Sequence, residues 1–316
     1  MSCTREQGGV APSPSQRLIA ATLRGTLKSL LSPAFQARAP VALQRRWLAT
    51  VARATLPARG VPRHQTRFAG VPVEVVGEGP AATLLYLHGG GYVAGSPATH
   101  RAITTRLARA LDATVMVVDY RLAPEHPSPA ALDDVVAVYR ALLDHGHRPE
   151  RMAVAGDSAG GGLSLAFLQH VRDGGELPPP AAGVLLSPWL DLTLTQTPRR
   201  VPGEAMLSHD WLAFAANAYA GERRQRPEVS PLAGDLNGLP PLLIQCGGDE
   251  ILGPDSERLA TALEQADTEA RYQLFADRWH VFQMHGGVLA DADRALAHIT
   301  DFLGARFQAG LREPRP

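Results

Sequence analysis

Hydrophobic and polar positions follow two alternating patterns along most of the chain. From residue 66 onward, short apolar runs rich in Val, Leu and Ile alternate with longer stretches in which apolar residues recur every three or four positions. Short apolar runs are typical of buried strands, and a period of three to four is typical of amphipathic helices. The runs predict strands at 71–76, 83–87, 114–119, 151–156, 182–187, 242–247 and 271–275. The periodic stretches predict helices at about 98–111, 130–144, 159–172, 254–266 and 288–304. Strands that alternate with helices predict an α/β fold with a mostly parallel, doubly wound sheet.

The first 60 residues do not share this alternation. Residues 1–16 are rich in Gly, Pro and Ser, which predicts a disordered tail. Two helices are expected after it, one over 16–31 and one that begins near Pro40. Their apolar stripes consist of Leu18, Ile19, Leu23, Leu27, Leu30 and Leu31, and of Leu43, Trp47, Leu48 and Val51. A basic amphipathic helix can lie on a membrane surface. The short stripes and the zero net charge favour packing on the body of the protein.

A second interruption lies at about 191–230, where no strand is expected. One helix is predicted there, at 209–220, with Ser208 as its N-cap and Gly221 at its end. The large apolar residues of this helix are Trp211, Phe214 and Tyr219. An insertion beside the carboxyl edge of a sheet can serve as a lid.

Composition narrows the range of partners. The chain of 316 residues has 31 Lys and Arg and 31 Asp and Glu, which appear scattered. Binding to a nucleic acid or to an anionic membrane needs a basic patch, so neither partner is expected. No apolar run of about 18 residues is present, so no membrane span is expected. Cys3 and Cys246 predict neither a disulfide nor a metal site. With no recognisable signal peptide, the expected location is cytoplasmic.

The strongest chemical motif is Gly156-Asp157-Ser158-Ala159-Gly160, between a predicted strand and a predicted helix. In this G-x-S-x-G setting a tight turn raises the serine above the sheet edge, and small flanking residues are needed. The alternative is a phosphate-binding turn, but the segment lacks the lysine and the glycine spacing of such turns. Ser158 is therefore the predicted nucleophile, and Asp157 is expected to serve local structure.

A glycine-rich segment, His-Gly-Gly-Gly at 88–91, follows the strand before it. Attack by a serine produces a negatively charged oxygen, which needs N–H donors aimed at it. Glycines allow the backbone to come close enough to donate. We predict that the N–H groups of Gly89, Gly90 and Ala159 form this oxyanion hole. The alternative is a flexible surface turn.

A serine nucleophile also needs a base and an acid that orients it, in the chain order Ser, acid, His. His280 lies in the loop between the last predicted strand and the last predicted helix and is the predicted base. His285, in the same loop, is the rival. The candidate acids after the preceding strand are Asp249, Glu250 and Asp255. We predict Asp249, since Asp255 fits the first turn of the next helix.

At these residues the chain resembles the hormone-sensitive-lipase-like family of α/β-hydrolases, in the branch with a Gly-Asp-Ser-Ala-Gly-Gly elbow. The matching segments are YLHGGGYVAGS (86–96), VDYRLAPEHPSPAALDD (118–134), VAGDSAGGG (154–162), SPWLDLT (187–193), SPL (230–232), LPPLLIQCGGDEIL (239–252) and WHVFQ (279–283). The resemblance implies a triad of Ser158, Asp249 and His280. It also implies a catalytic domain at 61–316, with a cap formed by 1–60 and the insertion.

The same resemblance implies hydrolysis of short- to medium-chain acyl esters without a cofactor or metal. The aromatic residues expected to line the substrate site are Tyr92, Trp189, Trp211 and Phe214. Gly162 and the pair Arg278-Trp279 depart from the residues usual in the family, and these departures concern the shape of the acyl pocket. Many relatives dimerise through the edge strand near 271–275, so a homodimer is possible.

Two other functions fit the same motifs. An amidase or a lactonase would use the same triad, and a substrate panel separates these enzymes from an esterase. A non-catalytic small-molecule receptor on the same fold is the third possibility. Plant gibberellin receptors of that kind have lost the catalytic histidine, whereas this chain retains His280.

Overall fold

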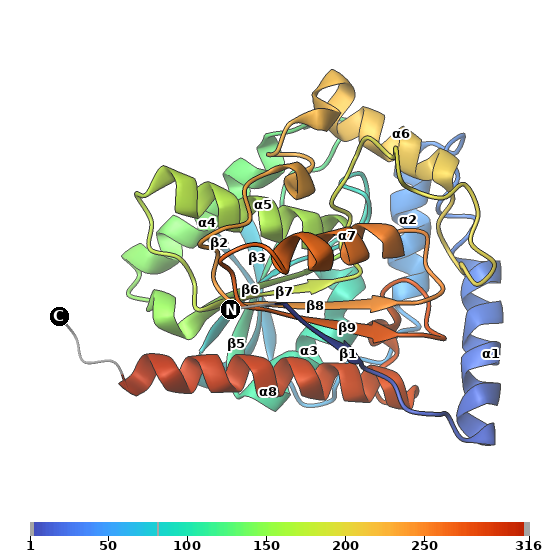
Figure 1. The fold of residues 1–316 in the computed structure, drawn as a ribbon, viewed down its shortest axis with the longest axis horizontal. Helices are drawn as coiled ribbons and strands as arrows, with labels where there is room; N and C mark the ends of the chain where they lie inside the picture. The colour runs from blue at the N-terminus through green and yellow to red at the C-terminus, as the bar shows by residue number, and fades with distance from the viewer. Residues whose placement is uncertain (1–2, 81, 313–316) are drawn as a thin grey trace.

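Nine strands within the described residues form one sheet (Figure 1). The computed structural model describes residues 3–80 and 82–312. The strands are β1 (Cys3–Gln7), β2 (Arg63–Phe68), β3 (Val71–Pro80), β4 (Thr83–Leu87), β5 (Ala113–Val118), β6 (Met152–Asp157), β7 (Ala182–Leu186), β8 (Leu242–Gly247) and β9 (Ala270–Phe275). Their order is β1-β9-β8-β7-β6-β4-β5-β3-β2. Only the pairs β2–β3 and β3–β5 are antiparallel.

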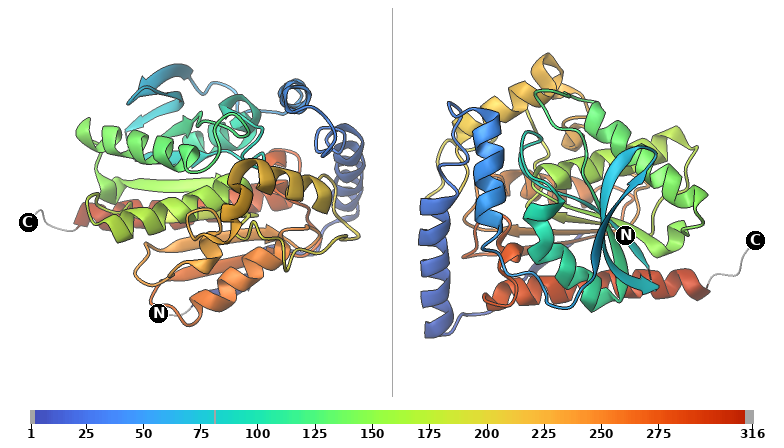
Figure 2. Two further views of the ribbon diagram at one scale, coloured as in Figure 1. Left: turned by 90° about the horizontal axis from the view of Figure 1, so that it is seen from above. Right: turned by 180° about the vertical axis from the view of Figure 1, so that it is seen from behind.

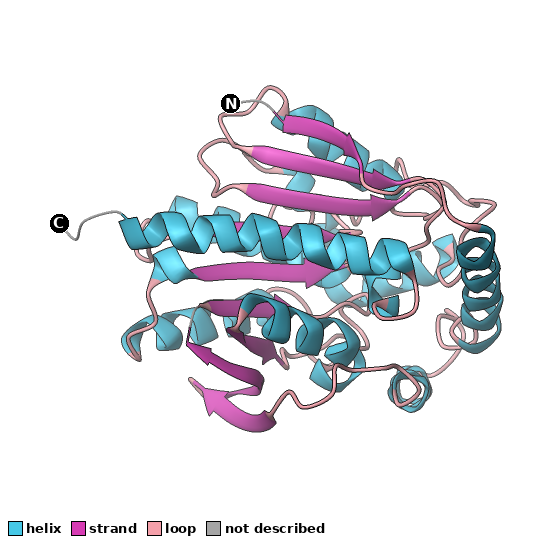
Figure 3. Cartoon of the chain, turned by 90° about the horizontal axis from the view of Figure 1, so that it is seen from below, coloured by secondary structure: helices cyan, strands magenta, loops and turns pink. Residues whose placement is uncertain are grey.

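Helices cover both faces of this sheet (Figures 2 and 3). They are α1 (Pro14–Leu30), α2 (Val41–Ala52), α3 (Arg101–Leu111), α4 (Ala130–Asp144), α5 (Ala159–Gly174), α6 (His209–Ala220), α7 (Gly253–Leu263) and α8 (Ala290–Arg312). Short 3-10 turns are η1 (Pro97–His100), η2 (Pro149–Arg151), η3 (Gly221–Gln225), η4 (Pro231–Ala233) and η5 (Phe282–His285). Side chains of α3 and α8 share one buried cluster with the strands, and those of α4, α5 and α7 share another.

The alternation of side chains along a strand explains these two clusters. Leu84 and Tyr86 of β4 belong to the cluster under α3 and α8, whereas Leu85 and Leu87 belong to the opposite cluster. Successive strand residues point to opposite faces, so a strand covered on both sides is apolar at nearly every position. All five residues of β4 are buried accordingly.

The predicted α/β architecture is confirmed, and so is each predicted strand, within one residue at its start. The two strands that were not predicted lie at the edges. β2, with the sequence RHQTRF, has no buried residue, so the apolar signal is absent. The predicted disordered tail instead forms β1, in which only Cys3 is buried. β1 pairs with the outer side of β9. β9 is therefore not the edge strand through which a homodimer was expected.

Helices α1, α2 and α6 lie at the carboxyl edge of the sheet, where the parallel strands end (Figure 1). Ser13 caps α1 and Ser208 caps α6 through side-chain bonds to the N–H groups of Gln16 and Trp211. Pro40 is the residue before α2. None of the helices within the described part of the chain is long and apolar enough to cross a membrane.

Candidate active site

Ser158 lies in a strained turn between β6 and α5. Its φ of 53° and ψ of −121° are rarely adopted by a residue with a side chain. A Cβ at Gly156 would lie 2.2 Å from the carbonyl oxygen of Gly160, and one at Gly160 would lie 2.0 Å from that of Leu87. The two glycines therefore let the turn close against β4 and place Ser158 at the carboxyl edge.

The glycine loop after β4 presents free donors beside this serine. The N–H of Gly89 donates to Asp157 Oδ1 at 3.2 Å, so this group is already occupied. Within residues 3–80 and 82–312, the N–H groups of Gly90, Gly91 and Ala159 have no acceptor. Ala159 is the first residue of α5, where an N–H has no helical partner. The N–H groups of Gly90, Gly91 and Ala159 are thus available to an oxyanion, whereas the N–H of Gly89, a donor predicted from the sequence, already has an acceptor.

Asp157, beside the nucleophile, cross-links the elements around it. Its Oδ1 accepts a hydrogen bond from the hydroxyl of Tyr86 at 2.8 Å, and its Oδ2 lies 3.2 Å from His100 Nε2. Burial raises the pKa of this carboxyl, but His100 lowers it further, so the net shift is downward. The buried carboxylate ties β6, β4 and η1 to the glycine loop, which is the structural role expected for it.

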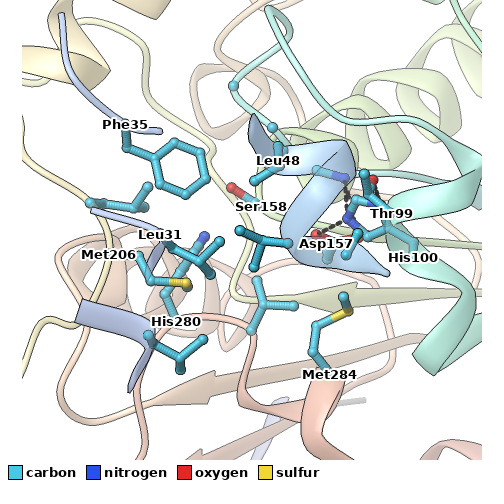
Figure 4. Close-up of a pocket in the computed structure, with 18 of the residues that line it drawn as sticks. Leu31, Phe35, Leu48, Thr99, His100, Asp157, Ser158, Met206, His280 and Met284 are labelled. Atoms are coloured by element: carbon cyan, nitrogen blue, oxygen red, sulfur yellow. Dashed lines mark hydrogen bonds and ion pairs between the residues drawn. The ribbon is translucent and has the colours of Figure 1, made fainter. Parts of the chain in front are cut away.

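His280 is buried and faces the carboxylate of Glu250. Its Nδ1 lies 3.5 Å from Glu250 Oε2, and the two side chains are 4% and 0% exposed. Burial lowers the pKa of His280, but the carboxylates of Glu250, Glu204 and Asp157 together raise it by more, so the net shift is upward. Figure 4 shows His280 and Ser158 on the same cavity. The structure therefore places the candidate base next to a buried carboxylate, which belongs to Glu250.

Asp249, the acid predicted from the sequence, faces the cap instead. Its Oδ2 accepts a hydrogen bond from Arg24 of α1 at 2.6 Å, and its side chain is 33% exposed. Arg24 also donates to the carbonyl of Asp277 at 2.9 Å and lies 5.5 Å from the ring centre of Trp279. In the described part of the chain no hydrogen bond or ion pair joins Asp249 to His280. The predicted acid and the predicted base are therefore not paired in the structure, because the two adjacent carboxylates reach different partners.

Ser187, just after β7, holds the acid and the histidine loop together. Its Oγ donates to Glu250 Oε2 at 2.7 Å and accepts the N–H of Val281 at 3.1 Å. Ser187 is fully buried, with a φ of 45°. Glu204, in the inserted segment, accepts the N–H of Ile251 at 2.8 Å. Sequence reasoning missed Ser187, although the segment SPWLDLT places it directly at a strand end, and it named Glu250 as a candidate but preferred Asp249.

The other candidates for the base and the acid, His285 and Asp255, lie in different environments. His285 also lines the cavity, but it has no acidic partner among the residues that the structure describes, and burial lowers its pKa to about 4. Asp255 lies in the first turn of α7, as predicted. It accepts the N–H groups of Leu190 and Asp191 at 2.8 and 3.0 Å. Burial raises the pKa of Asp255 to about 7. Asp255 therefore anchors the loop after β7, away from His280.

The cavity beside Ser158 has a volume of about 150 Å³ and is lined mainly by apolar side chains of the cap. They include Leu27, Leu31, Phe35, Leu48, Val51, Ala52, Met206, Leu207 and Trp211. Of the four aromatic residues predicted to line it, only Trp211 does. Tyr92 stacks on Tyr219 with ring centres 3.8 Å apart, and Trp189 donates to the carbonyl of Asp191 at 3.3 Å. Phe214 is half-buried against the core.

The departures from the usual family residues affect packing around the site. A Cβ at Gly162 would lie 2.1 Å from the carbonyl oxygen of Trp189, so a larger residue would push the loop away. Arg278 forms a buried ion pair with Asp291 at 2.7 Å. Trp279 is fully buried beneath Arg24. None of these residues lines the cavity.

No group of three or more His, Cys, Asp or Glu side chains that could hold a metal ion occurs in the described part of the chain. His147 Nδ1 lies 2.8 Å from Thr83 Oγ1, and His145 Nδ1 lies 2.6 Å from the carbonyl oxygen of Ala141. His145 and His147 lie close in the sequence, but each has its own hydrogen-bond partner in the protein.

Comparisons with known proteins fit this geometry. A profile of the alpha/beta hydrolase fold matches residues 84–284. The chain is 42% identical over 233 residues to an acetyl-hydrolase of Streptomyces hygroscopicus, covering 73% of this chain and 78% of that protein. The crystal structure of EstE5 soaked with ethyl alcohol matches with a TM-score of 0.87 and 35% identity, covering 94% of this chain and 100% of that one. An esterase from the bacterial hormone-sensitive lipase family matches with a TM-score of 0.83 and 37% identity, with coverages of 94% and 100%.

Proposed function

The chain belongs to the hormone-sensitive-lipase-like family of α/β-hydrolases and is a carboxylic-ester hydrolase, and we propose that Ser158, His280 and Glu250 are its catalytic triad. One observation carries this proposal. The buried His280 has its Nδ1 3.5 Å from the buried carboxylate of Glu250, and its ring lines the cavity that also contains Ser158.

In the first step Ser158 Oγ attacks the carbonyl carbon of the ester. His280 Nε2 accepts the hydroxyl proton, and Glu250 holds the imidazole in the tautomer that makes this possible. The carbonyl oxygen becomes negatively charged and is stabilised by the N–H groups of Gly90, Gly91 and Ala159. These donors are preorganised, because the glycine loop and the start of α5 are fixed before substrate arrives.

His280 then gives its proton to the oxygen of the leaving alcohol, and the bond between that oxygen and the acyl carbon breaks. The acyl group remains attached to Ser158 Oγ. A water molecule, deprotonated by His280, attacks this acyl-enzyme intermediate at the same carbon. The carboxylic acid leaves, and the proton returns from His280 to Ser158.

We propose that the substrates are small-molecule esters with short- to medium-chain acyl groups. The limited, apolar cavity of about 150 Å³ supports this, since it suits a hydrocarbon chain of a few carbons better than a long one. An amide or lactone substrate would use the same triad, so the ester preference itself is tested by parallel rates on matched amides and lactones.

A cytoplasmic location and a homodimer belong to the same proposal. Cys3 and Cys246 are both unpaired, as expected in a reducing compartment. β9 has a neighbour on each side, so a dimer built through the sheet would use the free edge of β1 or that of β2. Cell fractionation tests the location, and light scattering tests the mass in solution.

Covalent labelling tests the proposed triad directly. A fluorophosphonate should modify one serine, and mass spectrometry of the digested protein should locate the label at Ser158. The Ser158→Ala variant should remain unlabelled and fail to hydrolyse p-nitrophenyl butyrate. A label on another serine, or hydrolysis by Ser158→Ala near the unmodified rate, would contradict the proposal.

A further inference from the structure

The zero net charge conceals an uneven distribution of charge along the chain. Between Glu6 and Glu74 there is no Asp or Glu, but this stretch contains ten Arg and Lys residues. The rest of the chain therefore contains only 21 of the 31 basic residues but all 31 acidic residues. The charges are thus not scattered, as the sequence patterns suggested. The acid-free stretch includes α1 and α2, the two N-terminal cap helices.

Many of these cations have no acidic partner. Arg24 and Arg45 are exceptions, since they bind Asp249 and Glu125. The exposed cations of α1, α2 and their flanking loops that form no ion pair within 3–80 and 82–312 are Arg17, Lys28, Arg38, Arg46, Arg53 and Arg59. The outer side of the cap is therefore positively charged.

Large apolar side chains lie among these cations. Leu30 is 41% exposed, Leu43 is 55% exposed and Trp47 is 41% exposed. The indole N–H of Trp47 donates to the carbonyl of Leu30 at 2.6 Å, which joins α1 and α2 at this point. Leu43, Arg46, Trp47 and Arg53 recur at the helical period on the outer side of α2. We call Leu30, Leu43, Trp47, Arg46 and Arg53 the cap face.

The cap face is the outer side of the wall of the catalytic cavity. Leu27 of α1 and Leu48 and Val51 of α2 belong to the same two helices and line that cavity. Figure 2 shows α1 and α2 side by side at the end of the molecule that lies beyond the strand ends. A surface that contacts the cap face would therefore lie next to the cavity in which Ser158 stands.

We propose that the cap face docks on an anionic lipid surface, from which ester substrates reach the cavity. This inference rests on the proposed function of the cavity. Leucine and tryptophan side chains enter the boundary between headgroups and acyl chains, and arginines bind the lipid phosphates. A nucleic acid would leave Leu30 and Leu43 without an apolar partner. A second copy of the chain would bring two positively charged faces together.

Vesicle sedimentation tests this proposal with the full chain. The Ser158→Ala variant is used, so that no lipid is hydrolysed, with vesicles of phosphatidylcholine alone or mixed with phosphatidylglycerol. We expect sedimentation with the mixed vesicles and not with phosphatidylcholine alone, and release by added salt, because salt screens surface charges.

Paired substitutions then locate the surface. Arg46→Gln with Arg53→Gln should lower the partition coefficient about 25-fold, since each cation near an anionic surface contributes about fivefold. Leu43→Ser should lower it about tenfold through the lost apolar burial. The matched control is Arg63→Gln with Arg226→Gln, which removes the same charge from two exposed arginines outside the cap face. The control should bind vesicles as well as the parent does.

Several outcomes would overturn the proposal. They are equal binding to uncharged vesicles, an equal loss in the control, binding of a labelled DNA duplex instead of vesicles, or dimerisation that depends on Leu43. The cap-face variants carrying the native Ser158 should hydrolyse water-soluble butyrate ester at the parent rate. If that hydrolysis holds but no vesicles are bound, this inference fails alone. If Ser158→Ala still hydrolyses the ester, the proposed function fails, and the vesicle result is unaffected.

Discussion

The carboxyl edge of the sheet and the cap that covers it are built in different ways. At the edge, glycines and buried hydrogen bonds fix the backbone, as Gly156, Gly160 and Ser187 illustrate. In the cap, two amphipathic helices are tied to the sheet by a few partly exposed polar contacts, such as those of Arg24 and Arg45. The comparison indicates that the reaction depends on backbone geometry at the edge, whereas the cap sets which ester reaches it.

The largest expected effect is at the edge. Ser158→Ala and His280→Ala should each lower kcat/KM about 10³-fold or more, because the triad acts as a unit. His285→Ala is the matched control in the same loop and should lose less than about tenfold, since His285 has no acidic partner in the described structure. Initial rates on p-nitrophenyl butyrate measure this. A greater loss in His285→Ala would move the base to that residue.

The second effect separates two adjacent carboxylates. Glu250→Gln should lower kcat about 10²-fold or more, because the amide favours the wrong imidazole tautomer and leaves the imidazolium without a counter-charge. Asp249→Asn should change kcat less than about tenfold, since Asp249 faces Arg24. Steady-state kinetics of the two variants measure the two changes in kcat, and circular dichroism checks that both variants are folded. The reverse ranking would restore Asp249 as the acid.

The two carboxylates also show where sequence reasoning stops. The apolar runs of β4 to β9 act as constraints on each residue separately, so the fold could be predicted from pattern, and the glycines around Ser158 and the position of His280 after the last strand were enough to propose a nucleophile and a base. Asp249 and Glu250 stand side by side after Gly247-Gly248, and only the path of that turn decides which one meets His280. β1 could not be predicted for a similar reason. The strand forms because it pairs with β9, and it has almost no apolar residues of its own to signal it.

A pH profile sharpens the assignment of the base. The net upward shift in the pKa of His280, to which Glu250 contributes most among the neighbouring carboxylates, places its protonation above the ordinary histidine value. Protonated His280 cannot accept the Ser158 proton, so kcat/KM should fall on the acid side with a midpoint above that value. Glu250→Gln should move this midpoint to lower pH, because the raising charge is lost. Glu204 and Asp157 also raise the pKa and remain present. An unchanged midpoint in Glu250→Gln would contradict the coupling.

In the cap, the expected effects are on specificity. Each buried CH₂ contributes about 0.8 kcal/mol, or roughly fourfold in kcat/KM, until the chain meets the wall of the cavity. Beyond that point overpacking costs about 1–3 kcal/mol. We therefore expect an optimum between acetyl and octanoyl esters, and Leu48→Ala should move it to longer chains. Rates on a series of p-nitrophenyl esters measure the optimum. Best rates on palmitoyl ester by the unmodified enzyme would show that the cap does not limit chain length.

The smallest expected effect concerns the contact that links the two regions. Arg24 joins α1 to Asp249 and to the loop of Trp279, but its side chain is 31% exposed, so the ion pair and the cation–π contact should together stabilise the fold by only about 1 kcal/mol. Arg24→Met should lower the free energy of unfolding by about that amount and leave kcat on acetyl ester nearly unchanged.

Asp249→Asn should have a similar small effect, and the double variant should lose less than the two single losses together, because both remove the same ion pair. Denaturant unfolding of the three variants gives the coupling free energy. Additive losses would show that the ion pair does not fasten the cap. A large fall in kcat for Arg24→Met would show that α1 positions the loop of His280 as well as covering it. The cap would then contribute to the reaction itself and not only to the choice of ester.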